Sequence, residues 1–352
     1  MKILVIKMSA LGDVIQALPV IPALKRAFPH ARIHWLVEEV AEPVVRSHPG
    51  IDGVLVSRRG KWGRDLRDPR RWRKALGEVG ALVGDLRRGG YDLAVDLQGL
   101  LKSGIWMALA SARRKVGYDG TREGSDVFLT DRVPRVSLDV HAVERYLLLV
   151  EAVGAGTGEL SFGLSVPAGA RSHLRELLVE QGWDSCVPYA VLVPAARWES
   201  KQWGAAPFAA LADRLVDDLG LHVAITGVQT DRPLVEDIVR RMNHPALDLA
   251  GRTDMPTLMA LQEEAQVVVS TDSGPMHLAA AMGTPVVALF GPTAPWRTGP
   301  YGRRHRVIRA GVACSPCFRR ECPHRRCMER IRPEQVAEAV ADLMHDAQGA
   351  GG

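Results

Sequence analysis

The chain has 352 residues, 47% of them apolar and 24% charged, which is enough sequence for about two globular domains. Its five cysteines are too few for a disulfide-stapled secreted scaffold, and no apolar run is long enough to span a bilayer. The N-terminus does not read as a signal peptide, because Lys7 and Asp13 interrupt its apolar run. We therefore expect a soluble cytoplasmic protein.

The net charge of +5 is spread unevenly, with arginine and lysine concentrated in residues 58–74 and 303–326. Basic patches of this kind suit an anionic partner such as a phosphorylated substrate or an anionic membrane surface, although a solvated basic face is the ordinary alternative. Few aromatic residues lie between the arginines, and no nucleic-acid recognition motif is present, so nucleic acid is not an expected partner.

The first half alternates short apolar runs with helical segments, the pattern of a parallel α/β sheet. We expect strands at 3–7, 33–37, 54–56 and 91–97, and helices at 69–88 and 139–153. Asp13 follows the first strand, at the edge where open α/β sheets bind ligands, and is either a helix N-cap or a general base. The loop before Asp13 is not a GxGxxG fingerprint, which disfavours a nicotinamide site.

Four side chains of the first half are candidates for one cationic pocket. Lys102 follows the strand at 91–97, Arg122 lies in the loop-rich segment 116–130, and His141 and Arg145 belong to the helix at 139–153. The alternatives are a structural pair between Asp96 and Lys102 and ordinary surface positions for the helical residues.

A Gly-containing stretch at 154–188, with a helix near 172–180, is the expected domain linker. The α/β alternation then resumes. We expect strands at 189–193, 222–226, 267–270 and 286–290, and helices at 206–219, 231–242, 254–264, 276–282 and 333–345. The loop at 194–203 carries Arg197 and Lys201, and we expect the Gly-rich end to be disordered.

Residues 267–293 form a predicted strand–turn–helix–strand unit. Asp272 or Ser273 lies where an N-cap would be, and Pro275 where the first helical residue would be. Such a turn aims free backbone N–H groups and the positive end of a helix dipole at a ligand, and a diphosphate fits it. An ordinary βαβ turn is the alternative.

The cysteines form the cluster Cys314-x2-Cys317-x4-Cys322-x4-Cys327, with His324 inside it. Four thiols in this span could hold a structural metal, but the spacing matches no common zinc-ribbon or ferredoxin pattern. We favour metal-free thiols or a disulfide pair, and a lone packed thiol at Cys186.

Three segments together carry a family resemblance: residues 7–13 (KMSALGD), 96–103 (DLQGLLKS) and 270–277 (STDSGPMH). They resemble glycosyltransferase family 9, the bacterial lipopolysaccharide heptosyltransferases, and the resemblance extends from residue 1 to about residue 345. Residues 70–74, 121–123 and 141–145 are most similar to the type I heptosyltransferases, which add the first heptose to the Kdo of the inner core.

The resemblance implies a GT-B fold, in which two Rossmann-like, doubly wound domains face each other across a cleft. The implied bounds are an N-terminal acceptor domain at 1–160, a linker at 161–187, a C-terminal nucleotide-sugar domain at 188–330, and a helix and tail at 331–352 that cross back. It further implies an inverting transfer from ADP-heptose to a Kdo–lipid A glycolipid, without a catalytic cofactor, at the cytoplasmic surface of the inner membrane.

The resemblance also implies roles for individual residues. Asp13 matches the proposed general base of the family. The implied donor-binding residues are Arg197, Lys201, Asp272, Ser273, Gly274 and His277. The implied acceptor-binding residues are Ser9, Lys102, Arg122, His141, Arg145, Arg70, Arg71 and Arg73, the last three within a basic segment that would steer the lipid headgroup.

Two departures limit the choice of acceptor. Residues 195–197 read AAR, where type I sequences carry paired hydroxyls, and the segment 314–327 resembles type II heptosyltransferases. The alternatives are therefore a type II or other family 9 transferase acting on a heptosylated acceptor and, in a different class, a non-catalytic protein that binds sugar nucleotides or glycolipids. An oxidoreductase lacks its glycine fingerprint.

Overall fold

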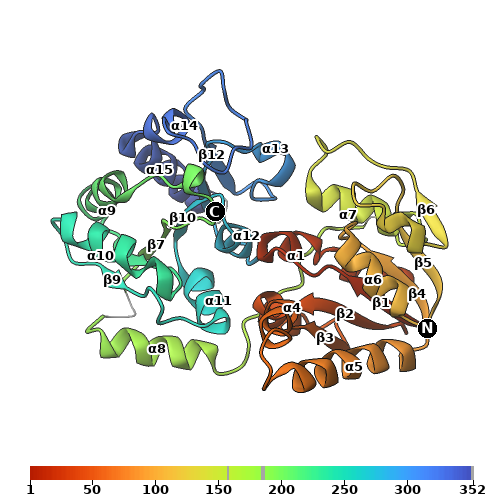
Figure 1. Ribbon diagram of the computed structural model, residues 1–352. Coiled ribbons are helices and arrows are strands. Elements are labelled where there is room, and N and C mark those ends of the chain that lie inside the picture. The colour runs from red at the N-terminus through yellow and green to blue at the C-terminus, as the bar shows by residue number, and fades with distance from the viewer. Residues whose placement is uncertain (157, 184–186, 350–352) are drawn as a thin grey trace. The chain divides into compact units, whose positions relative to one another are not determined.

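The computed structural model describes residues 1–156, 158–183 and 187–349, and the chain divides into two compact units, Met1–Ser165 and Val166–Gly352 (Figure 1). Each unit contains one six-stranded sheet in which every recorded strand pair is parallel. The prediction for Cys186 lies outside the described residues, as does the last part of the Gly-rich end.

The first sheet is built on β1, whose apolar residues are buried on both faces of the sheet. The strand order is β3-β2-β1-β4-β5-β6, and Ile3 of β1 is in register with Ile33 and Leu93. The strands are β1 (Lys2–Ile6), β2 (Arg32–Glu38), β3 (Gly53–Ser57), β4 (Tyr91–Asp96), β5 (Ala112–Tyr118) and β6 (Asp131–Val133).

Helices cover both faces of this sheet. They are α1 (Leu11–Ala17), α2 (Val20–Ala27), α3 (Glu42–Arg46), α4 (Arg59–Asp65), α5 (Trp72–Arg88), α6 (Leu101–Leu109) and α7 (Ala142–Glu151). Side chains of α4, α5 and α6 form a core cluster with Leu4 and Ile6, while α1 and α2 pack against α7. Pro19, which has no backbone N–H, separates α1 from α2.

The prediction that residues 116–130 are loop-rich is partly wrong. Residues 116–118 belong to β5, and β6 begins at Asp131, directly after the segment. The first half of β5 carries Arg113, Arg114 and Lys115, and its charged side chains hide the apolar pattern by which strands are found in sequence.

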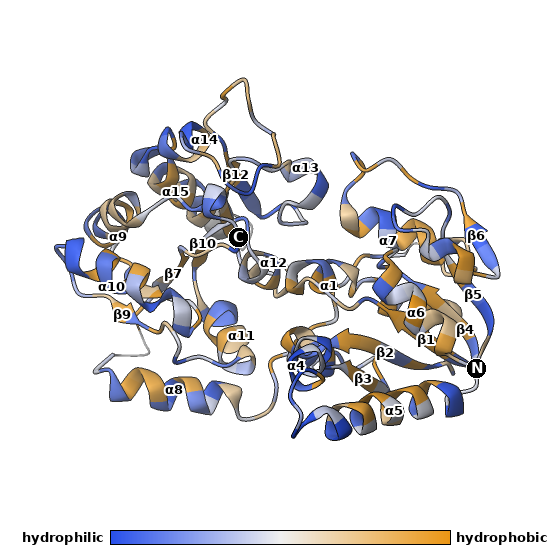
Figure 2. Ribbon diagram, viewed as in Figure 1, coloured by the Kyte–Doolittle hydropathy of each residue, from blue (hydrophilic) through white to orange (hydrophobic). Residues whose placement is uncertain are grey.

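The second sheet repeats the same plan, in the order β12-β11-β10-β7-β8-β9. Its strands are β7 (Tyr189–Val193), β8 (His222–Ile225), β9 (Leu247–Asp248), β10 (Val267–Thr271), β11 (Val286–Leu289) and β12 (His305–Ile308). Figure 2 shows strands of both sheets in the colours of apolar residues, whereas α4 is strongly hydrophilic apart from its buried Trp62.

The helices of the second unit are α8 (Ala170–Glu180), α9 (Ala205–Leu219), α10 (Arg232–Arg241), α11 (Met255–Glu264), α12 (Gly274–Ala281), α13 (Pro295–Thr298), α14 (Arg326–Glu329) and α15 (Pro333–Gly349). Helix α8, in the predicted linker, packs against α11 and belongs to this unit. Helix α15 packs against α9 and contributes Val336, Val340 and Leu343 to the core. That α15 crosses back to the N-terminal domain remains a prediction, as does a cleft between the two domains.

Both sheets have the doubly wound Rossmann order, in which the first strand lies beside the fourth. Ligands of such sheets bind beyond the carboxyl ends of the strands, where the order reverses. These switch points lie between β1 and β4 in the first unit and between β7 and β10 in the second. Among the described residues, no helix is both long enough and apolar enough to cross a membrane.

Candidate active site

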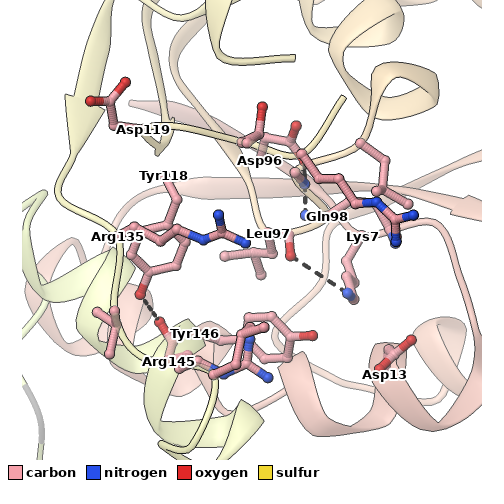
Figure 3. A pocket seen from close by; sticks show the side chains of 16 residues that line it. Lys7, Asp13, Asp96, Leu97, Gln98, Tyr118, Asp119, Arg135, Arg145 and Tyr146 are labelled. Atoms are coloured by element: carbon pink, nitrogen blue, oxygen red, sulfur yellow. Dashed lines mark hydrogen bonds between the residues drawn. The ribbon is translucent and has the colours of Figure 1, made fainter. Parts of the chain in front are cut away.

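A pocket of about 310 Å³ opens at the switch point between β1 and β4 (Figure 3). Its walls come from the residues at the ends of these two strands, from the first turn of α1, from the segments after β5 and β6, and from α7. The lining residues are Lys7, Asp13, Asp96, Leu97, Gln98, Gly99, Leu100, Tyr118, Asp119, Thr121, Arg122, Arg135, Val136, Leu138, Arg145 and Tyr146.

Asp13 brings a carboxylate into this pocket from the first turn of α1. Its Oδ2 atom accepts a hydrogen bond of 3.0 Å from the backbone N–H of Ala10, so one oxygen supports the start of the helix. Within the described parts of the chain, the other oxygen, Oδ1, has no hydrogen-bond partner. The side chain is only partly buried. Asp13 therefore contributes to the helix start and still has an oxygen that could accept a proton from a hydroxyl.

Four cationic side chains line the same pocket: Lys7, Arg122, Arg135 and Arg145. Arg135 donates from Nη1 to the carbonyl of Gly120 at 3.1 Å, and Arg145 donates from Nε to the carbonyl of Val140 at 3.1 Å. These bonds fix two guanidinium groups and leave further N–H donors for an anion. Sequence reasoning missed Arg135 because nothing in its neighbourhood marks it as a site residue.

Asp96, at the end of β4, organises the floor of the pocket. Its Oδ1 accepts from the N–H groups of Gln98 at 2.8 Å and Gly99 at 3.2 Å, and its Oδ2 accepts from Ser103 Oγ at 2.8 Å. Burial raises the pKa of the Asp96 carboxyl above its usual value, and these hydrogen bonds oppose the rise. The role of Asp96 is to shape the turn that enters α6.

The predicted pair of Asp96 with Lys102 is wrong. The oxygens of Asp96 are already occupied, and Lys102 Nζ instead lies 3.1 Å from Glu38 Oε1 and also donates to Ser9 Oγ. Lys102 and Ser9 thus meet each other, but neither is part of the pocket lining.

Among the other predicted acceptor residues, only Arg122 and Arg145 reach the pocket. His141 is the N-cap of α7, where its Nδ1 accepts from the N–H of Val143 at 3.2 Å. Of the four residues predicted for one cationic pocket, the structure thus places Arg122 and Arg145 on this lining, and Lys102 and His141 lie outside it. Lys7 and Arg135 complete the cationic lining instead.

The three predicted arginines of the basic segment lie on the exposed surface at the start of α5. Arg71 approaches Asp65 at 3.7 Å and Asp68 at 3.5 Å. The guanidinium of Arg73 lies 5.3 Å from the ring of Trp72, and Arg70 is exposed. None of the three lines the pocket.

The second unit has a polar centre at its own switch point. Lys201 ends the short helical turn Glu199–Lys201 in the loop after β7, and Asp272 directly follows β10. Their side chains form an ion pair of 2.7 Å, in which Asp272 is 7% exposed. Thr293 Oγ1 donates to Asp272 Oδ2 at 2.6 Å, and Lys201 Nζ lies 4.5 Å from the ring centroid of Trp198. Sequence reasoning missed Thr293 and Trp198.

Helix α12 begins at Gly274, two residues after Asp272 in the chain. Ser273 occupies the N-cap position without a side-chain capping bond, and its Oγ lies 3.2 Å from Ser270 Oγ. The suggestion of Asp272 as the N-cap is wrong, because its carboxylate pairs with Lys201 and Thr293 instead. The first N–H groups of α12 are therefore not taken by a side-chain cap, which suits them to an anion. His277 is buried within α12.

Arg197 is exposed in the loop between β7 and Lys201. The loop is tied to the cysteine segment, since Ser200 Oγ donates to the carbonyl of Arg319 at 2.7 Å. The guanidinium of Arg320 also lies 5.5 Å from the ring of Trp198. The loop that carries Arg197 and Lys201 is thus braced by a segment more than a hundred residues later in the chain.

The four cysteines of the cluster are free thiols, so the alternative of a disulfide pair is wrong here. Backbone hydrogen bonds from His324 and Arg325 lower the pKa of the Cys322 thiol, whereas burial and the three neighbouring thiols raise that of Cys327. Among the described residues, no three His, Cys, Asp or Glu side chains are arranged to hold a metal ion.

Comparison with known proteins agrees with this geometry. The model of glycosyltransferase family 9 (heptosyltransferase) matches residues 79–328. Lipopolysaccharide heptosyltransferase 1 of Pseudomonas aeruginosa is 30% identical, with 98% of each chain covered. A family 9 glycosyl transferase from Veillonella parvula has a similar fold, with a TM-score of 0.84, 22% identity and coverage of 98% of this chain and 97% of that one.

A third match is the structure of the E. coli heptosyltransferase WaaC with ADP, with a TM-score of 0.79, 22% identity, and coverage of 97% of this chain and 100% of that one. The two Rossmann-like units and these matches define a glycosyltransferase with the GT-B fold. The chain belongs to glycosyltransferase family 9, the heptosyltransferase family.

Proposed function

We propose that the protein transfers heptose from ADP-heptose to the Kdo of a Kdo–lipid A glycolipid, with inversion at the anomeric carbon and with Asp13 as general base. The observation that carries this proposal is the carboxylate of Asp13, whose Oδ1 has no hydrogen-bond partner among the described residues, in a pocket that the cations Lys7, Arg122, Arg135 and Arg145 also line.

The charge of this pocket fits the proposed acceptor. Kdo is a sugar acid, and its carboxylate would find two guanidinium groups whose positions are fixed by backbone carbonyls, at Arg135 and Arg145. Arg122, which is exposed, offers a third. The P. aeruginosa relative, a lipopolysaccharide heptosyltransferase 1 by name, supports an acceptor that belongs to lipopolysaccharide.

The donor would bind in the second unit. Its diphosphate suits the uncapped N-terminus of α12 at Ser273 and Gly274, together with Lys201 and Arg197. Asp272 holds Lys201 in place and would present its remaining hydrogen-bonding capacity to the sugar. The structure of WaaC with ADP supports this choice of nucleotide.

The proposed reaction is a single displacement. The acceptor hydroxyl gives its proton to Asp13 Oδ1 while its oxygen forms a bond to the anomeric carbon of heptose. The bond from that carbon to the diphosphate breaks on the opposite face, and ADP leaves with the electron pair. Lys201 and the N–H groups of α12 would offset the charge that gathers on the leaving diphosphate, in the manner of an oxyanion hole.

A peripheral position at the cytoplasmic face of the inner membrane completes the proposal. The acceptor is a lipid, and Arg70, Arg71 and Arg73 are exposed beside Trp72, which is 40% exposed. Basic side chains next to an exposed aromatic ring are suited to anionic headgroups. We place the three arginines at the headgroup and Arg122 and Arg145 at the sugar.

The test is a transfer assay that offers ADP-heptose with either Kdo2-lipid A or heptosyl-Kdo2-lipid A. We expect product from the first acceptor. Product from the second acceptor alone would instead establish the activity of a type II heptosyltransferase, the group that the cysteine segment resembles. Asp13→Asn should lower the rate by about 10²- to 10⁴-fold. Asp119→Asn, at a second carboxylate of the pocket wall, is the matched control, and a full rate for Asp13→Asn would reject the assigned base.

A further inference from the structure

The ion pair at the switch point of the second sheet has no net charge. Lys201 Nζ lies 2.7 Å from Asp272 Oδ2, so the cation is already compensated before any ligand binds. A nucleoside diphosphate carries more than one negative charge, and the N-terminus of α12 offers only about half an elementary charge. A diphosphate bound beside this pair therefore needs a further cation.

The loop between β7 and Lys201 offers no free hydroxyl to such a ligand. Residues 194–198 read PAARW, and the hydroxyl that follows them, Ser200 Oγ, is 1% exposed and donates to the carbonyl of Arg319 at 2.7 Å. Besides backbone N–H groups, cationic side chains must supply the contacts to an anion here. Arg197 is one of these, and it is exposed.

Arg320 brings a second guanidinium to the same place from the cysteine segment. Its guanidinium carbon lies 5.5 Å from the ring centroid of Trp198, and Lys201 Nζ lies 4.5 Å from that same centroid. One indole ring thus gathers two cations from distant parts of the chain. Among the residues that the structure describes, Arg320 forms no ion pair and donates no side-chain hydrogen bond to an oxygen, so its N–H donors remain available to an anion.

The backbone beside Arg320 is bound to the loop of Lys201. The carbonyl of Arg319 accepts from the N–H of Ser200 at 3.3 Å and from its Oγ at 2.7 Å. Ser200 directly precedes Lys201, so these two bonds fix the backbones of Arg320 and Lys201 next to each other. A side chain on an anchored backbone loses less conformational freedom when it binds a ligand.

The same segment is also bound to the other side of the ion pair. The N–H groups of Cys317 and Phe318 both donate to the carbonyl of Pro292, at 3.0 and 2.8 Å. Pro292 directly precedes Thr293, whose hydroxyl donates to Asp272 Oδ2 at 2.6 Å. Phe318 has a φ of 56°, a conformation that residues other than glycine rarely adopt, so tertiary contacts impose this path on the chain.

We propose that Arg320 is a donor-binding residue, which the cysteine segment brings to the diphosphate. Its guanidinium would pair with a phosphate oxygen and supply the positive charge that the neutral pair of Lys201 with Asp272 lacks, while Trp198 orients it. The ligand class is a nucleoside diphosphate or its sugar ester. The inference rests on the proposed role of the second unit as the donor domain and adds a residue to that site.

The experiment is a calorimetric titration of the wild-type protein, Arg320→Met and Arg320→Lys with ADP and with adenosine. Methionine can still cover the ring of Trp198 but has no charge, and we expect it to weaken ADP binding about tenfold. Adenosine has no phosphate, so its affinity should not change. Arg320→Lys keeps the charge and should retain most of the affinity for ADP.

Two controls separate a phosphate contact from other effects. Arg303→Met removes the same charge from an exposed position of the same basic segment, and it should bind ADP as the wild type does. Added salt should weaken ADP binding less in Arg320→Met than in the wild type, because one of the screened charges is gone. Thermal unfolding checks that each variant folds, and Arg320→Gln replaces Arg320→Met if the latter does not.

Several outcomes would overturn the proposal. Wild-type affinity for ADP in Arg320→Met would exclude Arg320 from the donor site. Equal weakening of ADP and adenosine would mean that Arg320 only supports the loop of Trp198, and an equal loss in Arg303→Met would mean a general effect of charge. In these cases ADP still binds to the wild type and the proposed function stands. A wild-type protein that does not bind ADP overturns the proposed donor, and the role of Arg320 with it.

Discussion

Lys201 Nζ and Asp272 Oδ2 lie 2.7 Å apart and join the segments that follow β7 and β10, the two strands at the switch point of the second sheet. Both side chains are largely withdrawn from water, at 16% and 7% exposure. Such a pair is costly to break, because removing one partner leaves an uncompensated charge in a desolvated position. The pair therefore links the stability of the second unit to its proposed donor site.

Lys201→Met should lower kcat/KM for the donor by about 10²-fold, since it removes a cation proposed to face the leaving diphosphate. It should also lower the free energy of unfolding by about 3 kcal/mol, because Asp272 loses its partner. Steady-state kinetics and denaturant unfolding measure the two effects. Arg214→Met breaks the exposed pairs of Arg214 with Asp218 and Glu334 and is the control. An unchanged donor KM and kcat in Lys201→Met would remove Lys201 from the donor site.

Asp272→Asn separates the two functions of the ion pair. The amide can still accept the hydrogen bond from Thr293, but it leaves Lys201 without its counterion. We expect a loss of stability smaller than that of the Lys201→Met variant, because Lys201 is more exposed and can reach water. A double-mutant cycle with Lys201→Met gives the coupling energy directly. A coupling near zero would mean that the pair is not formed in solution.

Arg145→Gln and Arg73→Gln should affect the acceptor differently. Arg145 lines the pocket, so its loss should raise KM by about tenfold for a soluble Kdo acceptor as well as for the lipid. Arg73 is exposed at the start of α5, so its loss should weaken only the use of acceptor embedded in anionic vesicles. Assays with both acceptor forms test this, and equal effects of Arg73→Gln on both would contradict a headgroup role.

His48 should make the first unit sensitive to acid. The ring is 4% exposed, and burial lowers its pKa from the usual 6.5 to about 4. Between these values the unfolded chain takes up a proton that the folded chain does not. The free energy of unfolding should therefore be unaffected above about pH 6.5 and fall as the pH drops toward 4, by about 3 kcal/mol in all.

His48→Asn tests this dependence. The amide oxygen can replace Nδ1 as acceptor for the N–H of Gly50, a bond of 3.0 Å, but it does not titrate. Urea unfolding at pH 7, 6, 5 and 4.5 should show a flatter dependence for this variant than for the wild type. His30→Asn, at an exposed position, serves as the control. The same slope in the His48→Asn variant and the wild type would assign the acid sensitivity elsewhere, with the partly buried His305, whose pKa is also lowered to about 4 by desolvation, as the next candidate.

Cys322 should react faster with iodoacetamide than Cys327 at pH 7.5. Backbone N–H groups lower the pKa of the Cys322 thiol, and burial raises the pKa of the Cys327 thiol, so the thiolate fraction differs between them. Mass spectrometry of peptides after timed alkylation measures both rates in one sample. Equal protection of all four cysteines, together with about one metal ion per chain, would contradict free thiols.

Much of the fold follows from the sequence because its signals are local. The buried runs at β7 and β10 are continuous apolar segments, and the predicted bounds of β7 are those of the structure. Asp13, Lys201 and Asp272 each lie in a segment that follows such a strand, at the edge where parallel strands end, and the resemblance to family 9 implied their roles. Where charge interrupts the pattern, as in β5, the prediction failed.

The tertiary structure decided which of these residues meet. Sequence position alone suggested Asp96 for Lys102, but Asp96 is saturated by its own turn, and Lys102 turns to Glu38. The tertiary structure also places Lys7 and Arg135, more than a hundred residues apart in the chain, in one pocket with Asp13. Residue order determines the strands and the edge at which a site forms. The partners within the site depend on side-chain packing and on which hydrogen bonds are already satisfied, and neither is a local property of the chain.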